Sequence, residues 1–247
     1  MTQPTEAVSQ AQNVRERIII ALDVETGEEA REISRELAGR VGAFKIGLQL
    51  FTAAGPKLVR QFTEAGIKVF LDLKFHDIPN TVAKASVEAA RLGVWMFNVH
   101  ASGGREMMMQ MVDAVDAACS KENIERPLII GVTVLTSSDT ETLREINVSG
   151  DVENQVASLA KLAAESGLDG VVASPNEVAA VRQAVSNGNF LTVTPGIRSI
   201  HATGDDQKRV TTFGRAIANG SDYVVIGRPI VGAPDRLVAL EQFVAEI

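Results

Sequence analysis

Cysteine is nearly absent from this sequence. Its one cysteine, Cys119, cannot form an intrachain disulfide, which suits a reducing compartment. Cys119 falls in a helical pattern over residues 105–119, and no histidine signature accompanies it. We therefore expect a small buried thiol at this position and not a catalytic nucleophile.

Long hydrophobic runs are also missing. No stretch reaches the roughly 18 apolar residues that a membrane-spanning helix needs. The first residues are polar and of mixed charge, without the apolar core of a secretory signal peptide. We expect residues 1–16 to form a flexible polar leader, and we expect a cytoplasmic protein with no membrane partner.

Basic side chains are in the minority, with 24 lysines and arginines against 31 aspartates and glutamates and a formal net charge of -7. Such a chain repels a polyanion unless its basic residues cluster, so polymeric nucleic acid is not an expected partner. Neither a G-x-G-x-x-G fingerprint nor a Walker P-loop occurs, which leaves nicotinamide cofactors and ATP without support. The three histidines, His76, His100 and His201, lack short metal-ligand spacing. We expect no cofactor and no metal, although loop carboxylates leave a Mg²⁺ site open.

Apolar residues are plentiful enough for a large core. Hydrophobic residues make up 45% of the chain and charged residues 22%, as in ordinary globular proteins. The 247 residues suit one α/β barrel of about 250 residues. No composition break or linker divides the chain, so residues 17–247 are expected to form a single domain.

Short β-branched runs alternate with segments of helical periodicity, which is typical of repeated βαβ units. The expected strands are residues 17–23, 43–48, 68–74, 96–101, 128–135, 170–174, 190–195 and 223–228. A helix is expected to begin at Gly55 and Pro56, and the polar region 137–151 is expected to be a mobile surface loop. Eight alternations favour a closed (β/α)8 TIM barrel over an open doubly wound sheet.

Charged residues recur near the ends of the expected strands, at Asp23, Lys45, Asp72, Lys74 and Arg228. In a barrel these ends build the active site, and a buried charge without a partner is costly. Side chains two residues apart share one face of a strand, so Asp72 and Lys74 should point the same way. The competing interpretation is a structural salt-bridge network at the barrel mouth.

Lys74 is expected to lie between two carboxylates, because Asp72 precedes it by two residues and Asp77 follows it by three. Opposite charges on both sides favour the ammonium form of a lysine. Imine formation requires the neutral amine, so a permanently charged lysine suits a proton donor or an electrostatic clamp. The arrangement therefore favours stabilising and protonating a carbanion.

Two segments containing glycine and arginine follow the last two expected strands, at residues 195–198 (PGIR) and 226–228 (IGR). Barrels commonly bind phosphate at this place. Glycine allows backbone N–H groups to approach an oxyanion, and Arg198 and Arg228 add charge-assisted hydrogen bonds. A lone Gly-Arg pair is ordinarily a turn with a solvated arginine, but its position after the final strand favours a phosphate site.

Residues 72–81 (DLKFHDIPNT) closely resemble the D-x-K-x-x-D signature of the orotidine 5′-phosphate decarboxylases, including its Ile-Pro-Asn-Thr extension. The resemblance continues in order at residues 21–23, 44–47, 98–104, 133–137, 194–198 and 226–229. It covers nearly the whole chain apart from the leader, and it is to the shorter bacterial form. It implies decarboxylation of orotidine 5′-phosphate to UMP and CO₂ in de novo pyrimidine biosynthesis, without a cofactor.

The resemblance also implies roles for individual residues. Lys74 would protonate C6 as CO₂ leaves, while Asp72, Asp77 and Lys45 would complete an array of alternating charges. Asp23 and Lys45 would contact the ribose.

Further positions would bind the rest of the substrate or the second subunit. Thr136 would lie against the pyrimidine. The phosphate would be held by Arg198, Gln207, the Gly227 amide and Arg228. In the family, the residues matching Asp77, Ile78 and Thr81 reach into the other subunit's site, which implies a homodimer.

Two alternatives remain at this point. One is a related barrel that acts on a sugar phosphate, such as a Mg²⁺-dependent keto-gulonate-phosphate decarboxylase or a pentose-phosphate epimerase, because these share a similar D-x-K-x-x-D motif. Lys45 and the Ile-Pro-Asn-Thr extension oppose it. The other is a catalytically silent barrel that binds UMP or orotidine phosphate, in which the acid and lysine array would have no use.

Overall fold

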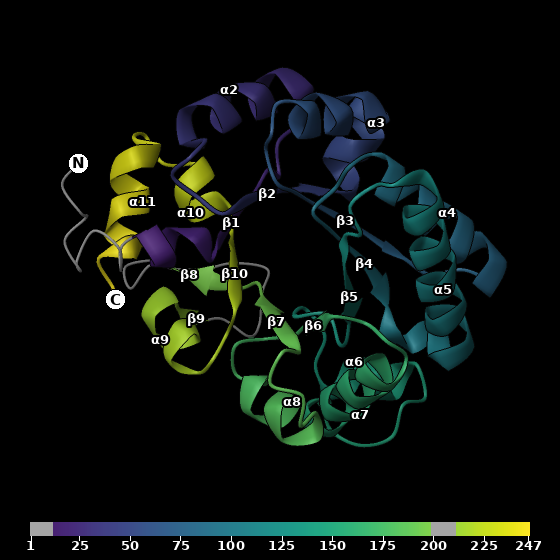
Figure 1. The fold of residues 1–247 in the computed structure, drawn as a ribbon. Helices are drawn as coiled ribbons and strands as arrows, with labels where there is room; N and C mark the ends of the chain where they lie inside the picture. Colours follow the sequence, from purple (N-terminus) through teal and green to yellow (C-terminus); the bar gives the residue numbers. More distant parts are fainter. Residues whose placement is uncertain (1–11, 199–210) are drawn as a thin grey trace.

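Eight parallel strands form a closed barrel in the computed structural model, which describes residues 12–198 and 211–247 (Figure 1). The strands are β1 (Ile18–Ala21), β2 (Ala43–Gly47), β3 (Val69–Phe75), β4 (Met96–His100), β5 (Leu128–Val132), β6 (Gly170–Val172), β7 (Leu191–Thr194) and β10 (Tyr223–Ile226). Each strand pairs with the next along the chain, and β10 closes the ring against β1. The predicted single-domain (β/α)8 TIM barrel is confirmed.

Helices follow the strands and surround the barrel (Figure 1). They are α2 (Gly27–Leu37), α3 (Leu48–Glu64), α4 (Pro79–Arg91), α5 (Gly104–Glu122), α6 (Thr140–Glu145), α7 (Val152–Glu165), α8 (Val178–Ala184), α9 (Phe213–Ala218), α10 (Arg228–Val231) and α11 (Arg236–Val244). A 3-10 turn, η1 (Ala101–Gly103), precedes α5, and β8 (Ile197–Arg198) pairs with β9 (Thr211–Thr212) in a small separate sheet.

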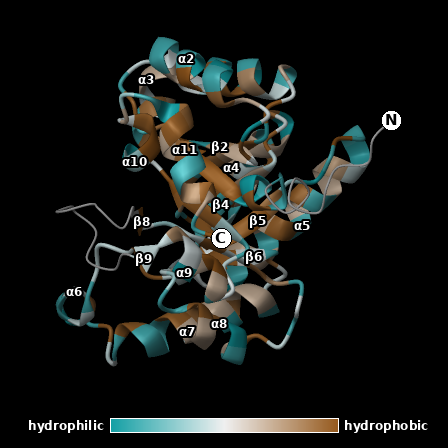
Figure 2. Cartoon of the chain, turned by 90° about the vertical axis from the view of Figure 1, so that its left-hand side faces the viewer, coloured by the Kyte–Doolittle hydropathy of each residue, from teal (hydrophilic) through white to brown (hydrophobic). Residues whose placement is uncertain are grey.

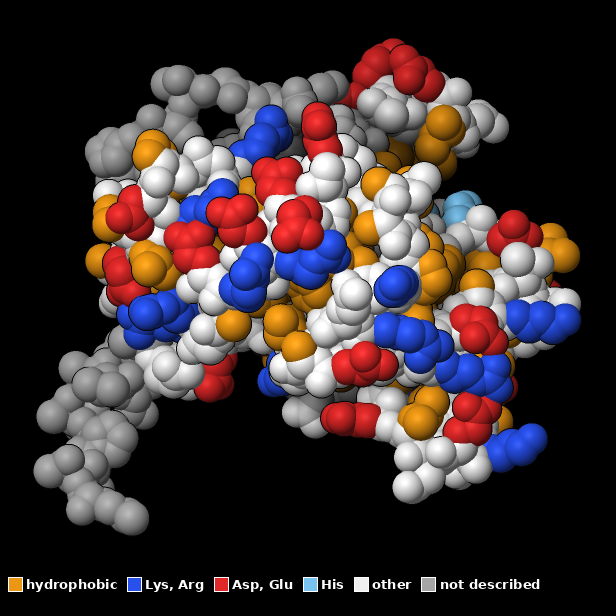
Figure 3. Space-filling view, turned by 90° about the horizontal axis from the view of Figure 1, so that it is seen from above, with side chains coloured by type: hydrophobic (Ala, Val, Ile, Leu, Met, Phe, Trp, Pro, Cys, Tyr) orange, Lys and Arg blue, Asp and Glu red, His pale blue; other side chains and the backbone are white. Residues whose placement is uncertain are grey.

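The helix α2 shows how the sequence specifies this outer layer. The Thr26 side chain accepts a hydrogen bond from the backbone N–H of Glu29, which caps the first turn. Apolar residues at helical spacing, Ala30, Ile33 and Leu37, are all buried. Hydrophilic residues cover the outside of the helices while the central strands are hydrophobic (Figure 2), and acidic and basic side chains are interspersed over α2 and α3 (Figure 3).

The apolar core has two parts, because a barrel strand buries both of its faces. On β3, Val69 and Leu71 pack in the cluster between the strands and the helices, whereas Phe70 lies in the cluster inside the barrel. At the amino ends of the strands, the rings of Trp95 and Tyr223 meet edge to face at 5.1 Å and pack against this inner cluster. The inner cluster therefore fills the barrel toward these ends.

Several expected boundaries were wrong. The helix α3 starts earlier than expected, at Leu48, but Gly55 is non-helical with a φ of 69° and divides it, so that a second helical stretch begins at Pro56 as the sequence indicated. The region 137–151, expected to be a loop, contains α6, whose capping box joins the Asp139 and Thr142 side chains to each other's backbone N–H groups. The end of the expected leader, residues 12–16, is helical, and its Arg15 pairs with Glu241 at 2.6 Å. Among the described helices, none has the length and apolar character required to cross a membrane.

Candidate active site

Lys74 lies where the pairing of β3 with β4 is irregular. From Leu71 to Phe75 this strand advances four residues, while its partner β4 advances two, from Phe97 to Val99. The two extra residues form a bulge, and within it Lys74 takes a left-handed φ of 53°. A non-glycine residue in this region carries backbone strain, which clusters at functional sites.

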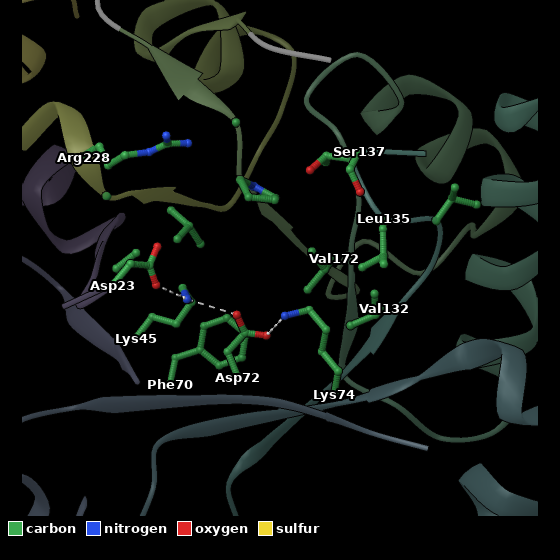
Figure 4. A pocket seen from close by; sticks show the side chains of 17 residues that line it. Asp23, Lys45, Phe70, Asp72, Lys74, Val132, Leu135, Ser137, Val172 and Arg228 are labelled. Atoms are coloured by element: carbon green, nitrogen blue, oxygen red, sulfur yellow. Dashed lines mark hydrogen bonds and ion pairs between the residues drawn. The ribbon is translucent and has the colours of Figure 1, made fainter. Parts of the chain in front are cut away.

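A chain of alternating charges crosses the carboxyl ends of the first three strands (Figure 4). The Lys45 ammonium lies 3.1 Å from a carboxylate oxygen of Asp23 and 3.1 Å from Oδ2 of Asp72. The other Asp72 oxygen, Oδ1, accepts a hydrogen bond from Lys74 Nζ at 2.6 Å. The predicted proximity of Asp72 and Lys74 is therefore confirmed, although the bulge and not plain strand alternation produces it.

Both central members of this array are buried and charged. Burial alone would raise the pKa of the Asp72 carboxyl, but Lys45, Lys74 and the Asn98 amide together hold that pKa below its usual value. Burial would likewise lower the pKa of the Lys45 ammonium, yet the charges of Asp72 and Asp23 raise it overall. The site thus keeps one carboxylate and one ammonium ionised at neutral pH where water is largely excluded.

The lysine that this chain places between two carboxylates is Lys45. Of the two carboxylates expected beside Lys74, only Asp72 forms an ion pair with it within the described part of a single chain. Asp77 is exposed, and its Oδ1 accepts a hydrogen bond from the backbone N–H of Ile78 at 2.7 Å. Ile78 itself is 66% exposed, and Thr81 is exposed on the first turn of α4. These three residues lie outside the cavity that the charged array lines.

A cavity of about 350 Å³ opens over the array. Of the residues predicted for the site, it brings together Asp23, Lys45, Asp72, Lys74, Thr136, Gly227 and Arg228. Its apolar wall consists of Phe70, Val132, Val134, Leu135, Val172 and Val225. One end is therefore charged and the walls are apolar, which suits a flat, partly polar ring held between them.

Arg228 lies on the side of the cavity away from Lys74 (Figure 4), and the strand-end glycines Gly196 and Gly227 also line the cavity. Gly196 has a φ of 85°, which favours glycine, and it lines the cavity. A side chain at Gly227 would place its Cβ 3.3 Å from Ala21 Cβ and 3.4 Å from an Asp23 oxygen. The Arg198 side chain and Gln207 lie outside the described part of the structure.

The sequence reasoning gave no role to two residues beside the array. Asn98 on β4 is 1% exposed and hydrogen-bonds both to Asp72 and to the backbone of Lys74. At Gly47 a Cβ would come within 3.0 Å of the Lys45 ammonium, so glycine leaves room for that charge. A polar residue in an otherwise apolar strand run was the available signal for Asn98.

Two histidines, His76 and His100, lie near Lys74 with ring centroids 5.5 Å apart. Burial lowers the pKa of His100, and the charges of His76 and Lys74 lower it further. Across residues 12–198 and 211–247, no group of three or more histidine, cysteine, aspartate or glutamate side chains is arranged to hold a metal ion.

Comparison with known proteins agrees with this geometry. The orotidine 5′-phosphate decarboxylase / HUMPS family matches residues 16–243. The orotidine 5′-phosphate decarboxylase of Syntrophotalea carbinolica is 54% identical over 94% of this chain and 95% of its own length. That of Geobacter sulfurreducens is 52% identical over 94% of this chain and 96% of its own.

A solved structure is similar as well. The crystal structure of orotidine 5′-phosphate decarboxylase from Lactobacillus acidophilus is 38% identical, covers 93% of this chain and 97% of its own, and superposes with a TM-score of 0.81. The chain therefore belongs to the orotidine 5′-phosphate decarboxylase / HUMPS family.

Proposed function

We propose that this enzyme decarboxylates orotidine 5′-phosphate to UMP and CO₂, as a carboxy-lyase of pyrimidine biosynthesis, by electrostatic stabilisation and protonation of a carbanion. Family membership supports the reaction, and the relatives that are about half identical carry this name. The observation that carries the mechanism is the contact of 2.6 Å between Lys74 Nζ and Asp72 at the cavity wall.

The chemistry at Lys74 follows from its charge. Loss of CO₂ leaves an electron pair at C6 in the plane of the pyrimidine ring, where the ring π-system does not stabilise it. A fixed ammonium facing that atom stabilises the developing negative charge without needing a metal ion or an organic cofactor. One N–H proton of Lys74 then passes to C6, which leaves UMP and a neutral lysine.

Asp72 and Lys45 prepare this step. Asp72 receives Lys45 on one oxygen and Lys74 on the other, so it fixes the position of the Lys74 ammonium before the substrate arrives. Catalytic groups that are already oriented need no reorganisation during the reaction. Lys45 and Asp23, joined at 3.1 Å, would also hydrogen-bond the ribose hydroxyls.

Groups across the cavity would hold the remainder of the nucleotide. Arg228 and the backbone of Gly227 would bind the phosphate, with help from Arg198 and Gln207. Thr136 lines the cavity beside Ser137 and would lie against the pyrimidine. Binding energy from the phosphate can be used in the transition state, so it can raise kcat as well as affinity.

The active form would be a homodimer in the cytoplasm. The exposed Asp77, Ile78 and Thr81 lie outside their own cavity, and an apolar side chain that is 66% exposed, as Ile78 is, suits burial by a partner. A second copy would supply Asp77 to the Lys74 site, which would complete the second carboxylate neighbour. The single cysteine suits the reducing cytoplasm.

The test of this function is a spectroscopic assay. Purified protein mixed with orotidine 5′-phosphate should remove the orotate absorbance and produce UMP, and the rate should survive exhaustive EDTA treatment. Lys74→Ala should retain the fold by circular dichroism but lose at least about 10⁴-fold in kcat, because proton donor and counter-charge vanish together. No absorbance change with wild-type protein, or a variant with a tenth of its turnover, would contradict the proposal.

A further inference from the structure

Asn98 joins the two residues on which the proposed chemistry depends. It lies on β4 with 1% of its surface exposed. Its Nδ2 donates a hydrogen bond to Asp72 Oδ1 at 2.7 Å, and its Oδ1 accepts one from the backbone N–H of Lys74 at 2.8 Å. One carboxamide therefore holds the carboxylate of one residue and the main chain of the other.

The contact to Lys74 lies at the β3 bulge. Two extra residues interrupt the β3 and β4 ladder here, and the backbone N–H of Lys74 donates to a side-chain oxygen, that of Asn98, at 2.8 Å. The Asn98 oxygen thereby supports the left-handed backbone, with its φ of 53°, from which the Lys74 side chain starts. The direction in which the ammonium enters the cavity depends on this backbone.

The hydrogen bond from Asn98 to Asp72 helps to hold the charged Asp72 carboxylate in place. Oδ1 of Asp72 accepts from both Lys74 Nζ and Asn98 Nδ2, while Oδ2 faces Lys45. When Lys74 gives its proton to C6 it becomes neutral and its attraction for Oδ1 weakens. The carboxamide of Asn98 stays neutral throughout, so its hydrogen bond to the same oxygen persists in every protonation state of the lysine.

We propose that Asn98 is a positioning residue of this decarboxylase, which fixes the Asp72 carboxylate and the Lys74 backbone relative to each other through its two hydrogen bonds. The inference rests on the proposed function and deepens it, since it assigns the orientation of the Lys74 ammonium to Asn98 as well as to Asp72. A residue of this kind should affect kcat and leave nucleotide affinity nearly unchanged.

The first experiment compares two variants that each lose buried hydrogen bonding from a barrel strand. Asn98→Leu keeps the approximate size and removes both contacts. Thr192→Val is the control, because the Thr192 hydroxyl also bonds an aspartate, Asp222, but at the amino end of β7. We expect Asn98→Leu to lower kcat about 100-fold, as a displaced catalytic group does, with the Kd for UMP changed less than about threefold. Thr192→Val should lower Tm and leave kcat within about twofold.

The second experiment uses Asn98→Asp, which keeps the size and the acceptor for the Lys74 N–H. This variant donates to Asp72 only while the two neighbouring carboxyl groups retain one shared proton. The ratio of its kcat to the wild-type kcat should therefore fall as pH rises from about 5 to about 9. The other titratable groups around Asp72 are Lys45, Lys74 and His100, with Asp23 on the far side of Lys45, and they are the same in both proteins.

The possible results distinguish a failure of the proposed decarboxylase function from a failure of the proposed role of Asn98. A wild-type protein without decarboxylase activity overturns the proposed function. An active wild type together with Asn98→Leu at more than a third of its kcat overturns only the role of Asn98, and so does an equal loss of kcat in Thr192→Val. If Asn98→Leu does not fold, a pH-independent ratio for Asn98→Asp overturns the role instead.

Discussion

Asp72 is the central residue of the candidate site. Its carboxylate is buried, with 8% of its surface exposed. Isolated in the interior, such a charge would be strongly unfavourable. Two ammonium groups and one carboxamide share its two oxygens, so its charge is balanced and its lone pairs are used. The same contacts that make the burial tolerable also fix Lys74, the proposed proton donor.

The lowered pKa of Asp72 predicts how stability depends on pH. The unfolded carboxyl titrates near pH 4, and the folded one below it, so the stabilisation is present above about pH 4 and is lost as pH falls through the folded value. We expect Asp72→Asn to be less stable than wild type by about 2 to 3 kcal/mol at pH 7, because Lys45 and Lys74 lose their shared partner.

Urea unfolding of both proteins between about pH 3 and pH 8 measures this difference. The gap between them should be constant above about pH 5 and should shrink below about pH 4. A gap of equal size at both ends of the range would mean that Asp72 is not held ionised by its neighbours.

Arg228 offers a separate prediction about the substrate. In Arg228→Ala, binding of UMP should weaken about 10- to 100-fold, because the phosphate loses a charge-assisted partner. Uridine lacks the phosphate, so its affinity should change less than about twofold in the same calorimetric titration. Equal losses for UMP and uridine would remove Arg228 from the phosphate site.

At the residue scale the sequence predicted which side chains meet but not how. Local spacing placed Asp72 beside Lys74, and strand ends placed Lys45 and Arg228 at the same cavity. The two-carboxylate environment of Lys45 depends on how β2 aligns with β1 and β3. Asn98 depends on the β3 bulge, a feature of pairing between strands that neighbouring residues do not encode.

At the scale of elements, the same arrangement of hydrogen bonds to an aspartate joins neighbouring strands at their amino ends in two places. Asp169 precedes β6 and accepts hydrogen bonds from the backbone of Ile129 and from Arg126. Asp222 precedes β10 and accepts at one oxygen from the backbone and hydroxyl of Thr192 and from Arg182. Each aspartate thus fixes its own strand to a neighbour at the face opposite the cavity, where a barrel maintains stability.

Asp222→Ala should therefore destabilise the fold without impairing catalysis. It removes three hydrogen bonds at 2.6, 2.6 and 2.9 Å, and we expect the free energy of unfolding to fall by about 3 kcal/mol. Below the melting transition, kcat should stay within about twofold of wild type. The control is Glu28→Ala, which breaks an exposed pair with Arg31 and should cost less than about 0.5 kcal/mol. An equal loss of unfolding free energy in the two variants would contradict the stabilising role of Asp222.

The order of helices and strands was predictable from the sequence, because hydrophobic periodicity is a local property. The residues at which they begin and end were harder to predict. The helix α3 begins at Leu48 directly after its strand, although Gly55 and Pro56 suggested a later start. Those two residues mark a kink inside α3, where a second helical stretch begins after the non-helical Gly55. The helix α6 went unpredicted because a six-residue helix is too short to show periodicity, and its Asp139 cap was the available signal.

At the scale of the whole molecule, the loop after β3 leads away from the cavity that the charged array lines. That loop carries Asp77 and Ile78 to the surface, where they face solvent in a single chain. Lys74 thus has Asp72 from its own chain, and the proposed second carboxylate, Asp77, would come from a partner chain. The proposed dimer is a closed twofold one, in which each chain would complete the other's site.

Subunit mixing tests this arrangement directly. Chains with Lys74→Ala and chains with Asp77→Ala should each be nearly inactive, because every site in either homodimer lacks one of the two groups. After reversible dissociation and mixing, about half of the dimers should be mixed, and each mixed dimer has one doubly altered site and one intact site, so roughly a quarter of all sites should regain activity. Native mass spectrometry verifies the exchange, and two differently tagged wild-type chains taken through the same procedure calibrate the recovery. If mixed dimers form and activity does not exceed the sum of the two parents, then Asp77 serves its own chain or has no part in the reaction.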